Sequence, residues 1–238
     1  MNFWEPHQFQ LWKPNRIQQW YANQLEVRLN PLNWLQQWYS DQLCQHDGNI
    51  VDIKIENCAN PGWGLDIKLK DTALEAVPFK EIKINRSEHE GLFCRVRDGE
   101  FYAAGDTFKL FELLQTYQNW VTLTGSIVNV DDTRNRHLLL NWLQEWFYAQ
   151  GDGYYSEFVC GITISTNGNQ GWTLKIGIEE TELEACSFEA LSIYHSEQDW
   201  LQCSVKDLKF QGSCAPLNLT QLLEVFRTWV EDVSSDPV

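Results

Sequence analysis

An internal repeat constrains the fold of this chain more than any other feature of its sequence. The segment that begins at Trp34 reappears 108 positions later at Trp142, and after one inserted residue the offset becomes 109. From Asn60 onward about a third of the aligned positions are identical, and the alignment needs no gap. Self-similarity of this kind is the signature of a duplicated structural unit. The 238 residues are therefore predicted to fold as two copies of one unit.

The pattern of apolar residues predicts the same order of elements in both copies. Asn30 and Pro31 form a helix start, with Trp34 and Trp38 on one face of the helix that follows. Apolar residues then alternate with polar ones around residues 51–55, 65–69, 82–84 and 92–96, with a short fifth strand at Phe101. A leucine-rich segment with helical spacing closes each copy. The predicted fold class is α+β: two tandem copies of a helix–antiparallel sheet–helix unit with four or five strands and the helices on one side.

The repeat also sets the domain boundaries. The first unit covers residues 32–122 and the second covers residues 139–233, with a linker at 123–138 and a tail at 234–238. Because the linker is short, we expect the two units to touch. Residues 1–31 are predicted to form an N-terminal helical arm, since a further copy of the opening helix motif begins at Ile17. The arm packs on the first unit or exchanges onto another molecule, and the first option is favoured because short exposed apolar helices are rarely left unpaired.

Charge limits the classes of partner. A formal net charge of −15 disfavours nucleic acid and anionic membranes, because both reward basic patches. The sequence contains no signal peptide and no apolar membrane span, and its seven cysteines form no dense framework, so we expect a cytoplasmic protein with free thiols. The net charge is −5 for residues 32–122 and −11 for residues 141–238. Such acidity serves solubility, or it suits a basic protein partner.

The densest acidic cluster lies in the second unit and consists of Glu179, Glu180, Glu182 and Glu184. A run of this kind is commonly a solvated edge, and it is also the first place to look for a basic partner. Trp63 and Trp172 each follow a turn glycine, and they are either exposed anchors for a partner or core residues at the start of a strand. Asp66, on the polar side of the strand that Trp63 begins, completes the predicted partner-binding set.

No catalytic or cofactor-binding motif is recognised. Cys94 and Cys203 alternate with leucine and valine on predicted strands, which favours buried structural thiols. Cys44, His46 and Cys58 could supply three metal ligands, but their spacing matches no zinc pattern. A phosphate-binding loop, a dinucleotide fingerprint and a nucleophile elbow are all missing from the sequence. We therefore expect neither enzymatic activity nor a metal or cofactor.

A set of motifs in the first copy resembles the immunity protein 53 family. They are the Trp-Leu-Gln-x-Trp-Tyr segment at Trp34, the Asn-Pro-Gly-Trp turn at Asn60, the Arg-Ser pair at Arg86 and the leucine-rich helix that ends at Trp120. The resemblance extends over residues 32–121 and, with departures such as Gln170 in place of proline, over residues 140–230. It implies a bacterial protein that neutralises the toxin domain of a polymorphic toxin system by binding to it.

The resemblance and the charge together predict a non-catalytic immunity protein whose partner is a cognate toxin with a basic surface, for example a nuclease. Toxins that attack nucleic acids are commonly basic, so an acidic inhibitor mimics the charge of their substrate and associates quickly. Two alternatives stay open: a peptide- or protein-binding scaffold of another pathway, and a thiol enzyme such as a sulfurtransferase. The expected molecule has one repeated architecture and two unequal surfaces, and the second unit is the expected docking side.

Overall fold

A computed structural model describes residues 30–45, 51–58, 62–86, 90–122, 138–150, 161–167 and 171–235. The first copy contributes α2 (Pro31–Gln45), β1 (Ile53–Cys58), β2 (Gly62–Lys68), β3 (Ile82–Asn85), β4 (Gly91–Arg97), β5 (Glu100–Asp106) and α3 (Leu110–Thr122). The second copy contributes α4 (Leu138–Ala149), β6 (Ile162–Asn167), β7 (Gly171–Gly177), β8 (Leu191–Ser196), β9 (Asp199–Lys206), β10 (Lys209–Cys214) and α5 (Leu219–Ser235). The predicted α+β architecture is confirmed, although β5 has seven residues where a short strand was expected.

Some expectations fall outside this description. The predicted N-terminal arm and the predicted linker lie almost entirely outside the described residues, so both stay predictions. None of the helices that the structure describes combines the length and the apolar character that a membrane span requires.

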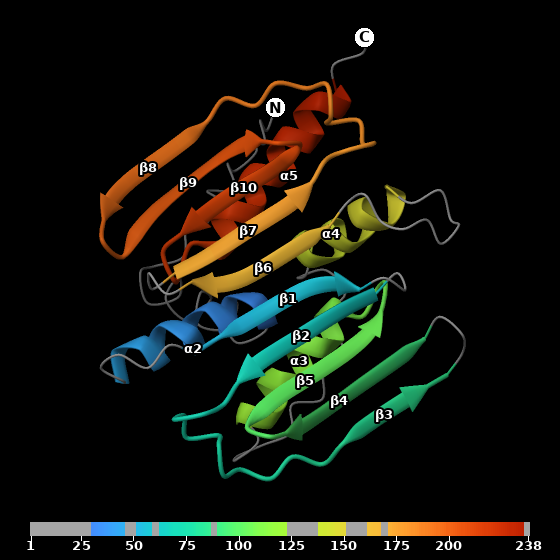
Figure 1. The fold of residues 1–238 in the computed structure, drawn as a ribbon, viewed down its shortest axis with the longest axis vertical. Coiled ribbons are helices and arrows are strands. Elements are labelled where there is room, and N and C mark those ends of the chain that lie inside the picture. The colour runs from blue at the N-terminus through green and yellow to red at the C-terminus, as the bar shows by residue number, and fades with distance from the viewer. Residues whose placement is uncertain are drawn as a thin grey trace, which may run out of the picture.

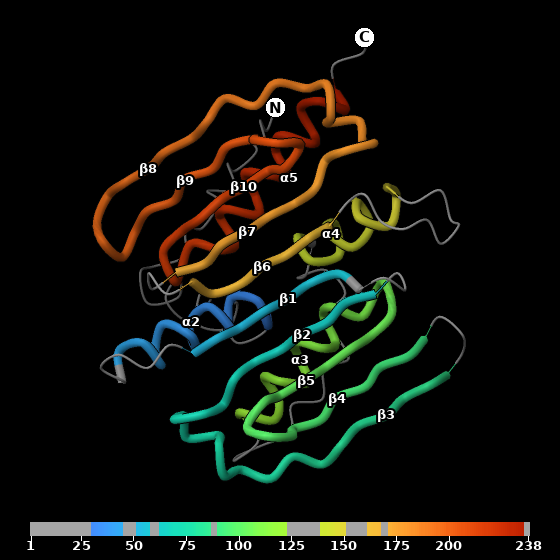
Figure 2. The backbone as a smooth tube through the Cα atoms, viewed as in Figure 1, coloured from blue at the N-terminus to red at the C-terminus, as the bar shows by residue number. Residues whose placement is uncertain are grey.

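All ten strands form one antiparallel sheet in the order β3-β4-β5-β2-β1-β6-β7-β10-β9-β8, and the four described helices lie on one face of it (Figure 1). The two copies join edge to edge where β1 runs beside β6, in the middle of the sheet (Figure 2). In that pairing Ile55 lies opposite Ile164, its own counterpart in the repeat. A contact in which equivalent residues face each other has the twofold symmetry of an isologous dimer interface. The chain is therefore built like a dimer whose two subunits are covalently joined.

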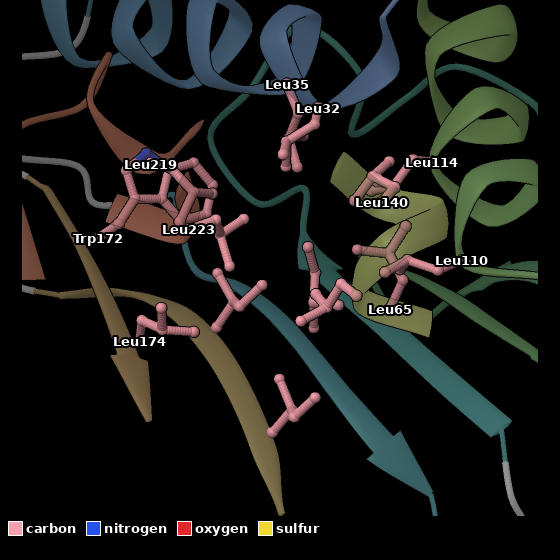
Figure 3. Packing of buried hydrophobic residues seen from close by; sticks show 14 of the residues in the cluster. Leu32, Leu35, Leu65, Leu110, Leu114, Leu140, Trp172, Leu174, Leu219 and Leu223 are labelled. Atoms are coloured by element: carbon pink, nitrogen blue, oxygen red, sulfur yellow. The ribbon is translucent and has the colours of Figure 1, made fainter. Parts of the chain in front are cut away.

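The hydrophobic core is continuous across the two halves. Figure 3 shows leucines of both halves, together with Trp172, converging on one interior. The first helix of each copy reaches a tryptophan of the other copy: Tyr39 of α2 packs against Trp172, and Phe147 of α4 packs against Trp63. The ring centroids are 5.0 Å and 5.6 Å apart, within the range of favourable aromatic pairs. The expected contact between the units is thus confirmed, and it is a shared core.

Two equivalent glutamines also connect the halves. Gln144 of α4 accepts a hydrogen bond at 2.9 Å from the backbone N–H of Leu110, the first residue of α3. Gln36 of α2 accepts one at 3.1 Å from the N–H of Thr220 at the start of α5, and its amide donates to the Thr220 hydroxyl at 2.7 Å. The first N–H groups of a helix have no acceptor within that helix. The closing helix of each copy is therefore capped by a side chain from the other copy.

Candidate functional site

The two tryptophans predicted as possible partner anchors are core residues. Trp63 and Trp172 are both 0% exposed. Their indole N–H groups donate to the backbone carbonyls of Thr107 and Pro216, both at 2.8 Å, in the turns that precede α3 and α5. Each tryptophan therefore ties a strand to the start of the closing helix of its own copy. An anchoring role is wrong for this conformation, and the alternative interpretation of a core residue at a strand start is correct.

The predicted glutamate cluster forms the turn that follows β7. Glu184 accepts a hydrogen bond at 2.7 Å from the N–H of Glu180, whose φ of 57° places it in the left-handed region. Glu184 thus stabilises the turn, as Glu75 does at the equivalent place in the first copy. Glu182 accepts a hydrogen bond at 3.3 Å from the hydroxyl of Ser234 near the end of α5.

This turn and the end of α5 together form a patch that we call the acidic edge, made of Glu179, Glu180, Glu182, Glu184, Glu231 and Asp232. All six residues are exposed. The last turn of α5 contains no basic residue, although the C-terminal end of a helix carries partial negative charge and favours cations. The equivalent turn of the first copy holds Lys70, Asp71, Ala73 and Glu75. The acidic edge is therefore a feature of the second half alone.

The sheet face opposite the helices, called the uncovered face below, has the opposite charge bias. Strand residues that alternate with the core positions project from it. These positions hold eight of the thirteen lysines and arginines in the described part of the chain: Lys54, Lys68, Lys83, Arg95, Arg97, Lys175, Lys206 and Lys209. The carboxylates at such positions are Glu56, Asp66, Glu100 and Asp106, all in the first half. The strands of the more acidic half therefore present no carboxylate on this face among the described residues.

A row of cross-strand neighbours runs across the uncovered face. The registers place Arg95 beside Tyr102, Tyr102 beside Asp66, Asp66 beside Lys54, and Lys54 beside Ser165. The row continues through the second half with hydroxyl and amide side chains only, at Thr173, Ser213, Gln202 and Ser192. A shallow hollow of about 500 Å³ lies over this half. The two copies thus share a scaffold and present different chemistry on the same face.

Asp66, the remaining predicted partner-binding residue, lies in this row. It is half-buried, and its pKa is raised above the usual value. Desolvation is the main cause, and the neighbouring carboxylates of Glu100 and Glu56 add to it, while Lys54 acts in the opposite direction. Asp66 therefore belongs to the uncovered face of the first half and not to the acidic edge of the second.

Arg95 forms a cluster that sequence reasoning missed. Its guanidinium carbon lies 5.6 Å from the ring centroid of Phe93 and 5.4 Å from that of Tyr102, within cation–π distance of both. We call these three residues the Arg95 platform. The sequence could have indicated this cluster, because Asp98 and Gly99 form a two-residue hairpin turn that sets the register of β4 against β5. Counting back from that turn places Arg95 opposite Tyr102.

The buried thiols have the environment expected of structural cysteines. Cys94 and Cys203 are 0% and 4% exposed, which confirms the prediction of burial. Desolvation raises the pKa of Cys94 to about 12, that of Cys203 to about 11 and that of Cys214 to about 12. Since the thiolate is the nucleophile, these three side chains are unsuited to thiol chemistry near neutral pH. Within the described ranges no three His, Cys, Asp or Glu side chains group as metal ligands, and His46 lies outside those ranges.

Fold and surfaces together define a class: a tandemly duplicated α+β protein with one uncovered sheet face and one acidic edge. Two segments of the chain, residues 32–122 and 140–231, match the family model described as Immunity protein 53. The matches cover most of the chain, and the protein belongs to this family. They coincide with the two halves of the sheet, which confirms the tandem duplication. Searches among curated proteins and among solved structures each gave no match.

Proposed function

We propose that the protein is a non-catalytic immunity protein that binds and neutralises a cognate toxin domain with a basic surface. Membership of the immunity protein 53 family through both halves carries this proposal, since the family implies a toxin-neutralising role. The acidic edge supports a basic partner, because exposed carboxylates gather there at a helix end that would be more stable with cations. Of these carboxylates, Glu231 pairs with Arg227 at 2.7 Å and Glu184 holds the turn, which leaves Glu179, Glu180, Glu182 and Asp232 to face a partner.

The acidic edge would act mainly on the rate of association. Charges exposed at the rim of an interface attract a partner of opposite sign over about a Debye length, roughly 8 Å at physiological salt. Neutralisation then follows from occlusion, because a bound protein of this size blocks access to the toxin surface beneath it. Inhibition in this form requires no chemistry from the immunity protein.

Co-expression with the toxin domain encoded beside its gene tests the proposal. We expect rescue of growth and a stable complex on gel filtration. Loss of both would overturn the proposed function. A neighbouring biosynthetic operon in place of a toxin gene would favour the scaffold alternative.

A charge-reversal variant tests the role of the acidic edge separately. We would change Glu179, Glu180 and Glu182 to lysine and keep Glu184, because Glu184 accepts the hydrogen bond that holds the turn. The association rate with the toxin should fall at least about tenfold at low salt, and the difference should shrink as salt screens the charges. Lysine at Asp71 in the equivalent turn of the first copy is the matched control. Equal rates for the parent and the triple variant would contradict docking at this edge.

A further inference from the structure

We propose that the uncovered face is a second docking surface, in which Arg95 binds a carboxylate of the toxin. The inference rests on the proposed function, because the partner is the same toxin domain. It adds a contact of opposite polarity in the other half of the molecule: the acidic edge meets basic groups, and the Arg95 platform meets an acidic side chain.

The geometry of the platform prepares Arg95 for such a ligand. The rings of Phe93 and Tyr102 hold the guanidinium from two adjacent strands, which restricts its rotamers before any partner arrives. Contact with aromatic rings leaves the N–H donors at the edge of the guanidinium available, and their fork matches the two oxygens of a carboxylate. Less conformational entropy is then lost on binding than for a free surface arginine.

Arg95 also lacks the ion pairs that some of the other basic residues on the uncovered face make. Arg97, two residues along the same strand face, pairs with Asp98 at 3.2 Å, and Lys54 pairs with Glu56 at 2.6 Å. Arg95 makes no ion pair or hydrogen bond through its guanidinium with any residue in the described ranges. Lys83, which lies opposite Phe93 in the register, likewise has no ion pair with a described residue. Among the described residues the platform thus carries a positive charge without an ion pair, on a protein of net charge −15.

The second copy shows that the fold does not require the platform. Its equivalent positions are Gln202, Ser204 and Gln211, on β9 and β10, and these strands pair in the same register as β4 and β5. An arginine in contact with two aromatic rings is therefore dispensable for building this hairpin. Its presence in one copy only points to recognition and not to packing.

The surroundings favour a single protein carboxylate over a polyanion. Asp66 lies beside Tyr102, and Glu100 lies opposite Arg97 on the same face. These carboxylates would repel the closely spaced phosphates of a nucleic acid, which reward continuous basic surface. One glutamate or aspartate side chain at Arg95 carries a single charge and meets less of that repulsion than a row of phosphates.

Binding measurements on the full-length protein and the toxin domain encoded beside its gene test the inference. We expect Arg95→Ala to weaken the equilibrium affinity at least about 30-fold, as for an interface hot spot, and Arg95→Lys to weaken it about tenfold because the fork is lost while the charge stays. The matched control is Arg97→Ala, which lies on the same strand face but is already paired with Asp98, and its affinity should stay within about threefold of the parent. Circular dichroism and melting temperature verify that each variant is folded. If Arg95→Ala does not fold, the affinity of Arg95→Lys tests the inference.

The outcomes separate the two proposals. Failure of the parent protein to bind the toxin would overturn the proposed function. Tight binding by the parent and equally tight binding by folded Arg95 variants would overturn this inference alone. Light scattering of the protein without toxin tests whether a second copy of this chain occupies the uncovered face. Dimers that form at high concentration and that Arg95→Ala abolishes would show this, and they would overturn the toxin contact.

Discussion

Replacing Gln144 by alanine removes the acceptor for the first N–H of α3 and so tests how the two halves are held together. Gln144 is only 2% exposed, so water cannot readily replace its amide oxygen. Loss of a buried hydrogen bond with one partner left unsatisfied costs about 1–3 kcal/mol, and we expect a loss of about 2 kcal/mol in the free energy of unfolding. For a chain of 150–250 residues each kcal/mol lowers Tm by about 2–4 °C, which gives a shift of roughly 4–8 °C.

Calorimetry and urea titration would measure this change. The matched control is Gln37→Ala in α2, because Gln37 is exposed and bonds only its helix neighbour Asp41 among the described residues; its effect should stay within about 0.5 kcal/mol. Gln36→Ala should resemble Gln144→Ala, and each variant should still unfold in one transition because the core is shared. A loss below about 0.5 kcal/mol for Gln144→Ala would refute the idea that this capping bond stabilises the joined halves.

Three further predictions follow from the structure. Leu208 has a φ of 54° where its counterpart Gly99 has 77°, so Leu208→Gly should raise stability by about 0.5–1 kcal/mol; a lower Tm would contradict this. Burial raises the pKa of Cys94 and Cys214 from 9.0 to about 12, so the folded state keeps protons that the unfolded state releases above pH 9. The contribution of these thiols to the free energy of unfolding should therefore be fully present below pH 9. It should fall by up to about 1.4 kcal/mol per pH unit for each thiol as pH rises toward 12. Equal urea midpoints at pH 8 and 10.5 would contradict this prediction. Cleavage at a protease site inserted between residues 122 and 138 should leave both fragments in one gel-filtration peak, and their separation would argue against a shared core.

Much of each unit could be predicted from local patterns. The side chain of Asn30 accepts hydrogen bonds from the N–H groups of Leu32 and Asn33, as its place before a helix-starting proline indicated. Alternation identified which strand residues face the core, and it already contained the correct answer for Trp63. That residue has the same phase as Leu65 and Ile67, so it had to face the helices. The glycine in the turn before Trp63, which suggested an exposed anchor, was the less reliable indicator.

The joining of the two halves could not be predicted in this way. Alternation distinguishes the faces of a sheet but not its edges, because strands pair through backbone groups that nearly every residue has. Nothing in residues 53–58 distinguishes a strand that ends a sheet from one that continues into another. The net charge of each unit was equally uninformative about its faces, since the carboxylates of the second half lie in turns and on α5 while its uncovered face carries lysines.

The pairing of β1 with β6 has a consequence for how this protein can change over time. In a dimer of identical chains every substitution appears on both subunits. A residue that improves a contact of one subunit therefore also changes the equivalent position of the other. Here a single codon alters one half and leaves the other as it was, while the paired strands and shared core keep both in place. Under the proposed function, one half can therefore change as the toxin changes while the other half retains its existing contacts.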